Sequence, residues 1–133
     1  MKRYFTNNFP ILNLHKKPSL KSEIVTQIIF GDSFSISKKK RNWIKVQIKE
    51  DGYEGFIKNR NFPRFLKPTH KIHILKSKVY KYPNKKKKLY EISFGSKIQV
   101  IEKKFNFFKF SKGWISKKDV KPINYREKNL FKN

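Results

Sequence analysis

Hydrophobic and polar residues alternate with a period of two in two separate stretches of the chain. In the first stretch Phe34 and Ile36 alternate with serines, and in the second Ile98 and Val100 alternate with polar residues. A period of two puts the hydrophobic side chains on one face of a β-strand. We therefore predict strands that bury one face, and only the tail 124–133 has a pattern compatible with a helix.

The two stretches are parts of an internal repeat. When Phe30-Gly31 is aligned with Phe94-Gly95, the hydrophobic positions of segment 24–48 coincide with those of segment 89–110. Each aligned half contains several short strand-like runs joined by turn residues. This organisation predicts two copies of a small barrel or sandwich.

A glycine followed by an aromatic residue and an isoleucine ends each copy. The first triplet begins at Gly55 and the second at Gly113. Because glycine has no Cβ, it lets a strand bend sharply and lets another backbone approach closely. We predict that these two glycines close the small sheets and that the aromatic residues after them cover the barrel ends.

The connections between the predicted strands contain turn residues and prolines. Asp51-Gly52 is the signal for a two-residue hairpin of type I′, in which both central residues need positive φ. The predicted linker between the halves lies around the proline-punctuated segment "NFPRFLKPTHKI" (61–72). Phe65 and Leu66 within it indicate that the two domains pack together.

The chain is strongly basic. It has 133 residues and a formal net charge of +25, from 34 Lys and Arg against 9 Asp and Glu, a balance typical of proteins that bind nucleic acid or an anionic surface. The basic residues are mostly Lys, and they accompany abundant Asn, Ile and Phe and no Ala, which is the bias of an AT-rich genome. We therefore expect part of the charge to reflect codon usage, with the runs 38–41 and 85–88 in solvated loops.

Several kinds of chemistry lack the residues they need. Cysteine is absent, which excludes disulfides, thiolate metal sites and a cysteine nucleophile within these residues. His15 lies in the predicted loop before Pro18, while His70 and His73 lie in the predicted linker, and three scattered histidines do not make a zinc signature. A glycine-rich phosphate loop is also missing. We expect no metal, no cofactor and no catalytic residue.

The sequence contains no signal-peptide pattern and no apolar segment long enough to span a bilayer. We therefore expect no membrane insertion and a cytoplasmic location, with a cell-wall-facing location as the alternative. We also expect a monomer.

The order of four motifs in the first half carries a family resemblance. "LNLHKKPS", "FGDSFSI", "NWIKVQI" and "DGYEGFI" together resemble a bacterial SH3-like domain. The second half resembles the second such domain of the NlpC-type cell-wall cysteine peptidases, which are γ-D-glutamyl-L-diamino acid endopeptidases. The resemblance implies an all-β fold of two tandem small SH3-like barrels packed through a short proline-containing linker. The domains would be 1–66 and 67–123, followed by a tail, 124–133, that leads towards a catalytic domain.

The resemblance also implies a function. Such domains accompany a catalytic domain that cleaves peptidoglycan stem peptides with a histidine-activated thiolate. Because this chain has no cysteine, we expect it to be no enzyme itself but a non-catalytic targeting or substrate-recognition region. Its expected partners are peptidoglycan or murein stem peptides and a cysteine-peptidase catalytic domain, either downstream in a longer protein or in trans.

Three residues are the expected substrate contacts. Tyr53 stands in the D-x-Y-x-G-aromatic segment that resembles the part of the first domain facing substrate. The resemblance implies an acidic partner for the substrate amine in the loop after Pro18, but Ser19 stands there. Glu23 and Glu54 are the candidate replacements. An ordinary half-buried strand tyrosine is the alternative interpretation of Tyr53.

Two other functions compete with substrate recognition. A basic small-barrel protein that binds nucleic acid would use its lysine runs together with exposed aromatics as stacking platforms. A structural spacer would bind no ligand at all. Trp43 and Trp114 are aromatic enough to stack on sugars or bases, but packing within the barrels is the favoured interpretation for each.

Overall fold

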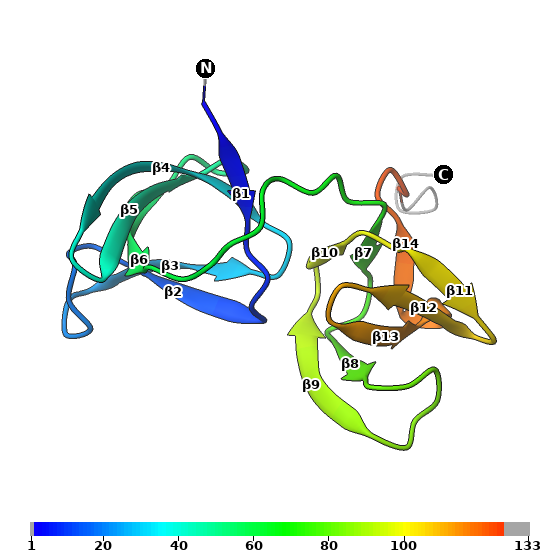
Figure 1. Cartoon of the computed structure of the whole chain (residues 1–133). Coiled ribbons are helices and arrows are strands. Elements are labelled where there is room, and N and C mark those ends of the chain that lie inside the picture. Colours follow the sequence, from blue (N-terminus) through cyan, green and yellow to red (C-terminus); the bar gives the residue numbers. More distant parts are fainter. Residues whose placement is uncertain (1, 127–133) are drawn as a thin grey trace, which may run out of the picture.

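The computed structural model describes residues 2–126, which form two small β-domains side by side (Figure 1). The first domain is one antiparallel six-stranded sheet in the order β1-β4-β5-β6-β2-β3. Its curvature brings the two edges of the sheet towards each other as a small barrel (Figure 1). The strands are β1 Tyr4–Thr6, β2 Ile11–His15, β3 Ile24–Ile29, β4 Ser33–Lys40, β5 Trp43–Ile48 and β6 Glu54–Lys58.

The second domain is also built from antiparallel strands. It has a three-stranded sheet, β10-β7-β14, and a five-stranded sheet, β11-β12-β13-β8-β9. The all-β prediction is confirmed, since residues 2–126 contain strands and one 3₁₀ turn. The elements are β7 His70–Ile72, β8 Lys76–Tyr80, β9 Lys88–Ser93, β10 Lys97–Ile98, β11 Glu102–Lys104, β12 Phe107–Phe110, β13 Gly113–Ser116, η1 Lys117–Asp119 and β14 Val120–Pro122.

The predicted strand alternation is visible in the burial of side chains. Phe34 and Ile98 are fully buried, whereas Ile36 and Val100 are half-buried and pack against the edges of the two cores. Each domain buries its own set of aliphatic and aromatic side chains, which supplies most of the driving force for folding. The first core contains Leu14, Ile28, Phe34, Ile44, Val46, Ile48 and Ile57. The second contains Ile72, Val79, Ile92, Ile98, Phe110, Ile115 and Val120. The predicted tail 124–133 lies mostly outside the described residues.

The glycines confirm the internal repeat at the level of backbone conformation. Gly31 and Gly95 have φ values of +88° and +87°. A Cβ on Gly55 would lie 2.6 Å from the carbonyl oxygen of His15, and a Cβ on Gly113 would lie 2.6 Å from that of Tyr80. Real Cβ atoms do not approach oxygen so closely, so the predicted role of both closing glycines in backbone approach is confirmed.

The hairpin between β5 and β6 differs from the predicted type I′ turn. The Ile48 amide donates to the Tyr53 carbonyl at 2.9 Å, and the Gly52 amide donates to the Ile48 carbonyl at 2.9 Å. Four residues therefore form the loop, and only Gly52 of the Asp51-Gly52 pair has positive φ, at +78°. Asp51 instead accepts a hydrogen bond from the Tyr53 amide at 3.0 Å. Its side chain stabilises a longer turn that the dipeptide signal does not distinguish.

The two domains contact each other through Phe30, which lies just after β3. Its side chain is only 4% exposed and belongs to the core of the second domain, where its ring meets that of Phe110 edge to face at 5.5 Å. The Lys97 amide donates to the Phe30 carbonyl at 2.9 Å. Phe94 occupies the same position in the second repeat and is 55% exposed. One repeated motif thus connects the domains in its first copy and faces solvent in its second.

An ion cluster covers this contact. The Lys97 ammonium lies 3.0 Å from a carboxylate oxygen of Asp32 and 3.4 Å from one of Glu50. Burial alone would lower the pKa of Lys97, but the two carboxylates outweigh that effect and the pKa is raised. The cation therefore stays paired with the first domain over the whole neutral range.

The predicted linker packs along the first domain. Phe5 forms a β-bridge with Arg64, and the Leu66 amide donates to the Thr6 hydroxyl at 3.0 Å. Phe65 lies under the Lys49 ammonium, 4.9 Å from the ring centre. Leu66 and Phe30 line a small cavity of about 60 Å³ between the domains. The domains do pack together as predicted, although Phe30, rather than the linker residue Phe65, enters the neighbouring core.

Candidate functional site

Tyr53 lies at the end of the β5–β6 loop, immediately before β6. The hydrogen bonds around it hold its backbone on both sides, through Ile48 and Asp51. Its side chain is 51% exposed, so it is not the half-buried strand tyrosine of the alternative interpretation. The loop therefore presents the phenol to solvent from a fixed backbone, which suits a hydrogen bond to a ligand.

Glu54 lies next to Tyr53 and lines an open hollow on the outer side of the first sheet. Gln47 is its cross-strand neighbour and accepts a hydrogen bond from the Lys2 ammonium at 3.1 Å. Lys2, Arg3 and Lys39 line the same hollow. One carboxylate among three cations leaves the hollow net positive, which disfavours an ammonium ligand and favours a carboxylate.

Glu23 lies away from Tyr53 and Glu54. It immediately precedes β3, and its carbonyl accepts a hydrogen bond from the Lys16 amide at 2.8 Å. In the sheet order, β2 separates β3 from β6. The structure thus brings Tyr53 and Glu54 together at one hairpin and leaves Glu23 on a different part of the barrel.

Ser19 holds the turn in which the resemblance implies an acidic residue. Its hydroxyl accepts a hydrogen bond from the Lys21 amide at 3.2 Å, and its carbonyl accepts one from the Ser22 amide at 3.1 Å. The Ser22 hydroxyl in turn bonds the carbonyls of Lys17 and Ser19, each at 3.0 Å. This serine network stabilises the loop but supplies no negative charge for a substrate amine.

A cluster of aromatic residues on the outer face of the first sheet was not predicted. His15 was expected in a loop, but it ends β2, is buried, and meets the Trp43 ring edge to face at 5.5 Å. The Lys58 ammonium lies 5.6 Å from the centre of the Trp43 ring. Phe56 pairs with His15 across β2 and β6. It therefore lies on the face opposite the core, rather than over the barrel end as predicted.

The second domain repeats this outer cluster at corresponding positions. Tyr80 meets the Phe107 ring edge to face at 6.0 Å, and both pack with Trp114. The Lys109 ammonium lies 5.7 Å from the centre of the Trp114 ring. The predicted packing role of Trp114 is confirmed. The sequence contained a signal for both clusters. Each aromatic residue stands next to a core residue on its strand, so its side chain points to the opposite face of the sheet.

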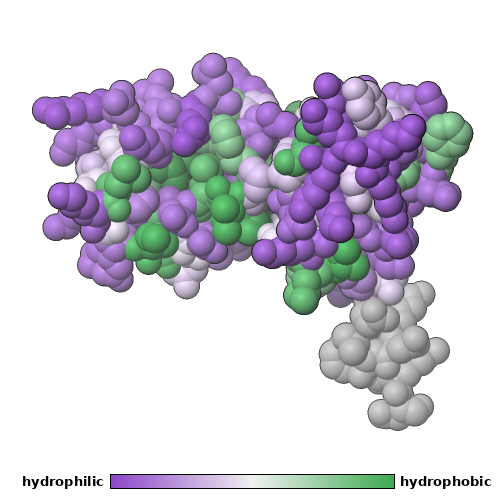
Figure 2. All heavy atoms as spheres, turned by 90° about the horizontal axis from the view of Figure 1, so that it is seen from below, coloured by the Kyte–Doolittle hydropathy of each residue, from purple (hydrophilic) through white to green (hydrophobic). Residues whose placement is uncertain are grey.

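The two barrels present different surfaces. Figure 2 views the molecule from below and shows hydrophobic side chains on both barrels, with a broad hydrophilic area across the second. The exposed hydrophobic residues of β2 and β3 are Ile11, Ile24 and Val25. Residues 67–126 hold 18 Lys and Arg against three Asp and Glu. The two copies therefore share a backbone plan but not a surface chemistry.

His70 was expected in the linker but begins β7 within the second domain. Its ring lies 4.9 Å from that of Phe108, and its Nδ1 lies 2.8 Å from the Thr69 hydroxyl. Burial, and then the positive charge of Lys103, lower the pKa of His70. The folded protein therefore favours the neutral imidazole.

This environment predicts a pH-dependent stability. Because the pKa of His70 is lower in the folded state than its unfolded value of about 6.5, the unfolded state binds more protons at acid pH. We expect the free energy of unfolding to be highest above about pH 6.5 and to fall as the pH decreases below it. Urea unfolding between about pH 7.5 and 5.5 measures the slope of the free energy of unfolding against pH. His70→Asn should flatten it, and equal slopes in both proteins would contradict the assignment.

A known protein family matches the first barrel. Residues 14–61 match the family described as the bacterial dipeptidyl-peptidase SH3 domain. This segment runs from the end of β2 to just beyond β6 and contains Tyr53, Glu54 and Glu23. The first barrel is therefore similar to a bacterial dipeptidyl-peptidase SH3 domain.

Similarity extends beyond this SH3 domain. The chain is 25% identical over 118 residues to the gamma-D-glutamyl-L-lysine dipeptidyl-peptidase of Bacillus subtilis (strain 168), an alignment that covers 78% of this chain and 40% of that protein. A crystal structure of an NlpC/P60 family protein from Bacillus cereus ATCC 10987 has the same fold, with a TM-score of 0.71 and 16% identity. That match covers 96% of this chain and 57% of the other. The chain thus spans about two fifths of the length of the curated relative.

Within the described residues, no helix is long and apolar enough to cross a membrane. The same residues contain no group of three His, Asp or Glu side chains placed to hold a metal ion.

Proposed function

We propose that this protein is the substrate-recognition region of a peptidase that acts on peptidoglycan stem peptides. The match of the first barrel to the dipeptidyl-peptidase SH3 domain carries the proposal. The relative named above is a γ-D-glutamyl-L-lysine dipeptidyl-peptidase, and its name defines the peptide chemistry. Because this chain has no cysteine, a catalytic domain elsewhere supplies the thiolate.

The β5–β6 hairpin is the proposed contact with the stem peptide. Tyr53 offers a hydroxyl from a hydrogen-bonded loop, and the neighbouring hollow is lined by Lys2, Arg3 and Lys39. A stem peptide carries carboxylates on its D-glutamyl residue and at its end, and these groups suit a positive hollow. We therefore assign Tyr53 to hydrogen bonding and the cations to carboxylate recognition. Glu54 and Glu23 stay separate predictions as contacts for a substrate amine, because the hollow beside Glu54 is net positive and Glu23 lies on another part of the barrel.

The 133-residue protein tests this proposal by NMR titration with the peptide L-Ala-γ-D-Glu-L-Lys at about physiological salt. We expect shifts concentrated at Tyr53 and Glu54, with an affinity of about 1 mM because a shallow surface buries little of the peptide. Tyr53→Phe should weaken binding about five-fold, since one hydrogen bond contributes about 1 kcal/mol. Tyr82→Phe, which alters an exposed tyrosine of the second barrel, is the matched control.

Three results would contradict parts of the proposal. Absence of shifts at the hairpin would remove it as the contact surface. Equal affinity for the N-acetylated peptide would remove the amine contacts of Glu54 and Glu23. Tighter binding of single-stranded DNA than of the peptide at the same salt would favour nucleic-acid binding, whose affinity falls steeply as salt rises.

A further inference from the structure

An exposed phenylalanine stands at the turn between β11 and β12. Lys104 pairs with Phe107 across the two strands, which leaves Phe105 and Asn106 as the two turn residues. Phe105 has φ +55° and is 74% exposed. In Figure 1 this turn lies on the side of the second barrel that faces away from the first.

The backbone conformation of this turn recurs in the first barrel, whereas the phenylalanine does not. The corresponding turn of the first barrel, between β4 and β5, has Arg41 at φ +57°. Positive φ is unstrained for glycine and tolerable for asparagine, but it is costly for a bulky side chain. A large apolar residue here combines backbone strain with exposure to water. Such a combination points to a function outside the stability of the fold.

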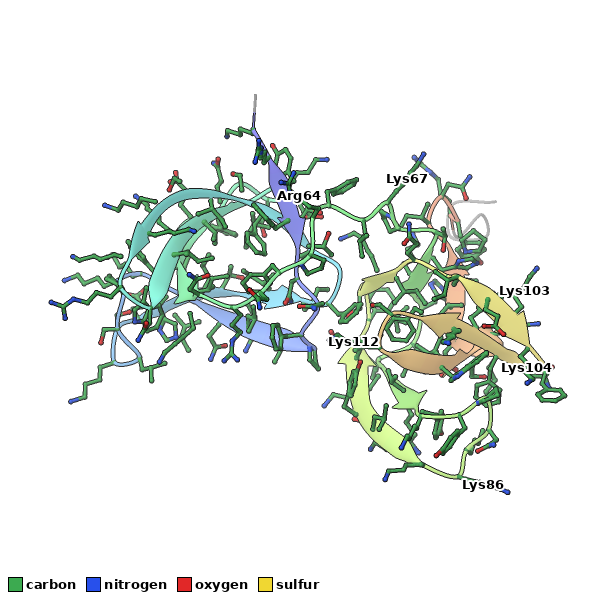
Figure 3. The ribbon with its side chains drawn as sticks, viewed as in Figure 1. Arg64, Lys67, Lys86, Lys103, Lys104 and Lys112 are labelled. Atoms are coloured by element: carbon green, nitrogen blue, oxygen red, sulfur yellow. The ribbon has the colours of Figure 1, made fainter. Side chains whose placement is uncertain are left out.

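Lysines surround the turn. Figure 3 shows Lys103 and Lys104 extending outwards beside this turn, and Lys86 extending from the β8–β9 loop below it. The Lys104 ammonium lies 5.9 Å from the centre of the Phe105 ring. The Lys117 amide donates to the Asn106 carbonyl at 3.0 Å, which ties η1 to the turn. We call this region the hairpin-tip surface; its residues are Lys85, Lys103, Lys104, Phe105, Asn106, Lys117 and Lys118.

The acidic residues of the second barrel do little to neutralise the hairpin-tip surface. Glu91 is paired with Lys88 at 2.9 Å, and the Asp119 carboxylate accepts a hydrogen bond from Ser77 at 2.8 Å. Glu102 is the remaining one of the three in residues 67–126, and its cross-strand neighbour is Lys109. The surface therefore presents a strong local positive potential, which attracts anionic partners.

The number of exposed aromatic rings decides which anionic partner fits. Phe105 is the one aromatic residue of the hairpin-tip surface, because the side chain of Phe107, on the other side of the turn, is buried. Single-stranded nucleic acid binds to several aromatic rings on which successive bases stack, and one ring does not form such a series. At a bilayer surface, aromatic and aliphatic side chains both bury in the boundary between headgroups and acyl chains while lysines contact anionic headgroups.

We propose that the hairpin-tip surface binds the surface of an anionic phospholipid membrane. Phe105 enters the boundary below the headgroups, and the lysines contact lipid phosphates from around it. The protein binds peripherally, with the β11–β12 hairpin as its only inserted element. This inference is independent of the proposed recognition of stem peptides, because it uses the opposite domain.

Co-sedimentation of the 133-residue protein with lipid vesicles tests the proposal. We expect binding to vesicles of phosphatidylcholine mixed with phosphatidylglycerol and little binding to phosphatidylcholine alone. Phe105→Asn should weaken binding about ten-fold, because an apolar side chain is lost from the boundary. It should also raise the thermal unfolding temperature, since asparagine tolerates positive φ. Lys103→Gln and Lys104→Gln should each weaken binding about five-fold.

Arg41→Asn is the matched control, because it makes the same change of backbone strain in the corresponding turn of the first barrel. It should raise the unfolding temperature and leave vesicle binding within about two-fold of wild type. Equal binding by Phe105→Asn and wild type would overturn the proposal. A single-stranded oligonucleotide that binds more tightly than the anionic vesicles at the same salt, and that loses affinity in Phe105→Asn, would replace the lipid with nucleic acid.

Discussion

Gly31→Ala is expected to lower the free energy of unfolding by about 2–5 kcal/mol and to disrupt the contact between the barrels. Two costs add at this position. Alanine at φ +88° is strained by about 1–2 kcal/mol. Its Cβ would also lie 2.2 Å from the carbonyl oxygen of Lys97, so the backbone of the second barrel must move. That movement would separate Phe30 from the core it enters.

Gly95→Ala supplies an unusually close control for this prediction. Gly95 has nearly the same φ, +87°, but a Cβ there would meet only the Ile29 side chain, at an ordinary 3.6 Å. We expect the free energy of unfolding of this variant to fall by only about 1–2 kcal/mol, from backbone strain alone. Urea unfolding of both variants gives the difference, and equal destabilisation would show that the contact with Lys97 relaxes without cost.

Phe30→Ala is expected to destabilise the second barrel by about 3–5 kcal/mol, although residue 30 follows a strand of the first. Its ring fills space beside Phe110 within the second core, and its removal leaves a cavity there. Two tryptophans allow the barrels to be followed separately. Trp43 reports on the first barrel, and Trp114 reports on the second. The fluorescence transition of Trp114 should move to lower urea in a Trp43→Phe background.

Phe94→Ala is the matched control for Phe30→Ala, because Phe94 has the same place in the second repeat and is largely exposed. We expect it to change stability by less than about 1 kcal/mol. A shift of the Trp43 transition alone in Phe30→Ala would mean that Phe30 supports its own barrel, and it would contradict the packing described above.

Phe30 and Phe94 have different roles, and only Phe30 helps to fix the two barrels relative to each other. Phe30 places an aromatic ring in the neighbouring core, and Lys97 pairs with two carboxylates at its edge. A buried aromatic ring contributes far more to the stability of the contact between the barrels than an exposed linker does. The relative placement of the barrels therefore depends on Phe30. The same position in the second barrel is occupied by a solvent-facing Phe94. The two copies therefore share a backbone conformation at this position but use its side chain differently.

Local sequence signals predicted the elements that depend on neighbouring residues. Alternation at Phe34 and Ile98 predicted strands with one buried face, because side chains on a strand point to alternate sides. The repeated glycines predicted close backbone approach, because no other residue lacks a Cβ. The signal failed at Asp51-Gly52, where the Asp51 side chain stabilises a four-residue loop. A dipeptide signal does not include such side-chain hydrogen bonds.

The candidate site was predictable only in part. Tyr53 was expected to face substrate from the family resemblance alone, and its side chain is exposed. The net positive surroundings of Glu54 were not expected, because Lys2, Arg3 and Lys39 reach the hollow from other strands. His15 was expected in a loop because Pro18 follows closely, but the strand continues to His15 and buries its ring against Trp43.

The sequence by itself determined that the chain forms two β-barrels of one repeated plan and that it contains no cysteine nucleophile. These properties depend on residue type and on the spacing of near neighbours. Only the tertiary structure decided that Phe30 enters the other barrel, that Glu54 lies among cations, and that Phe105 stands exposed among lysines. Each of these depends on which distant segments come together, and two copies with the same local pattern can make such contacts differently.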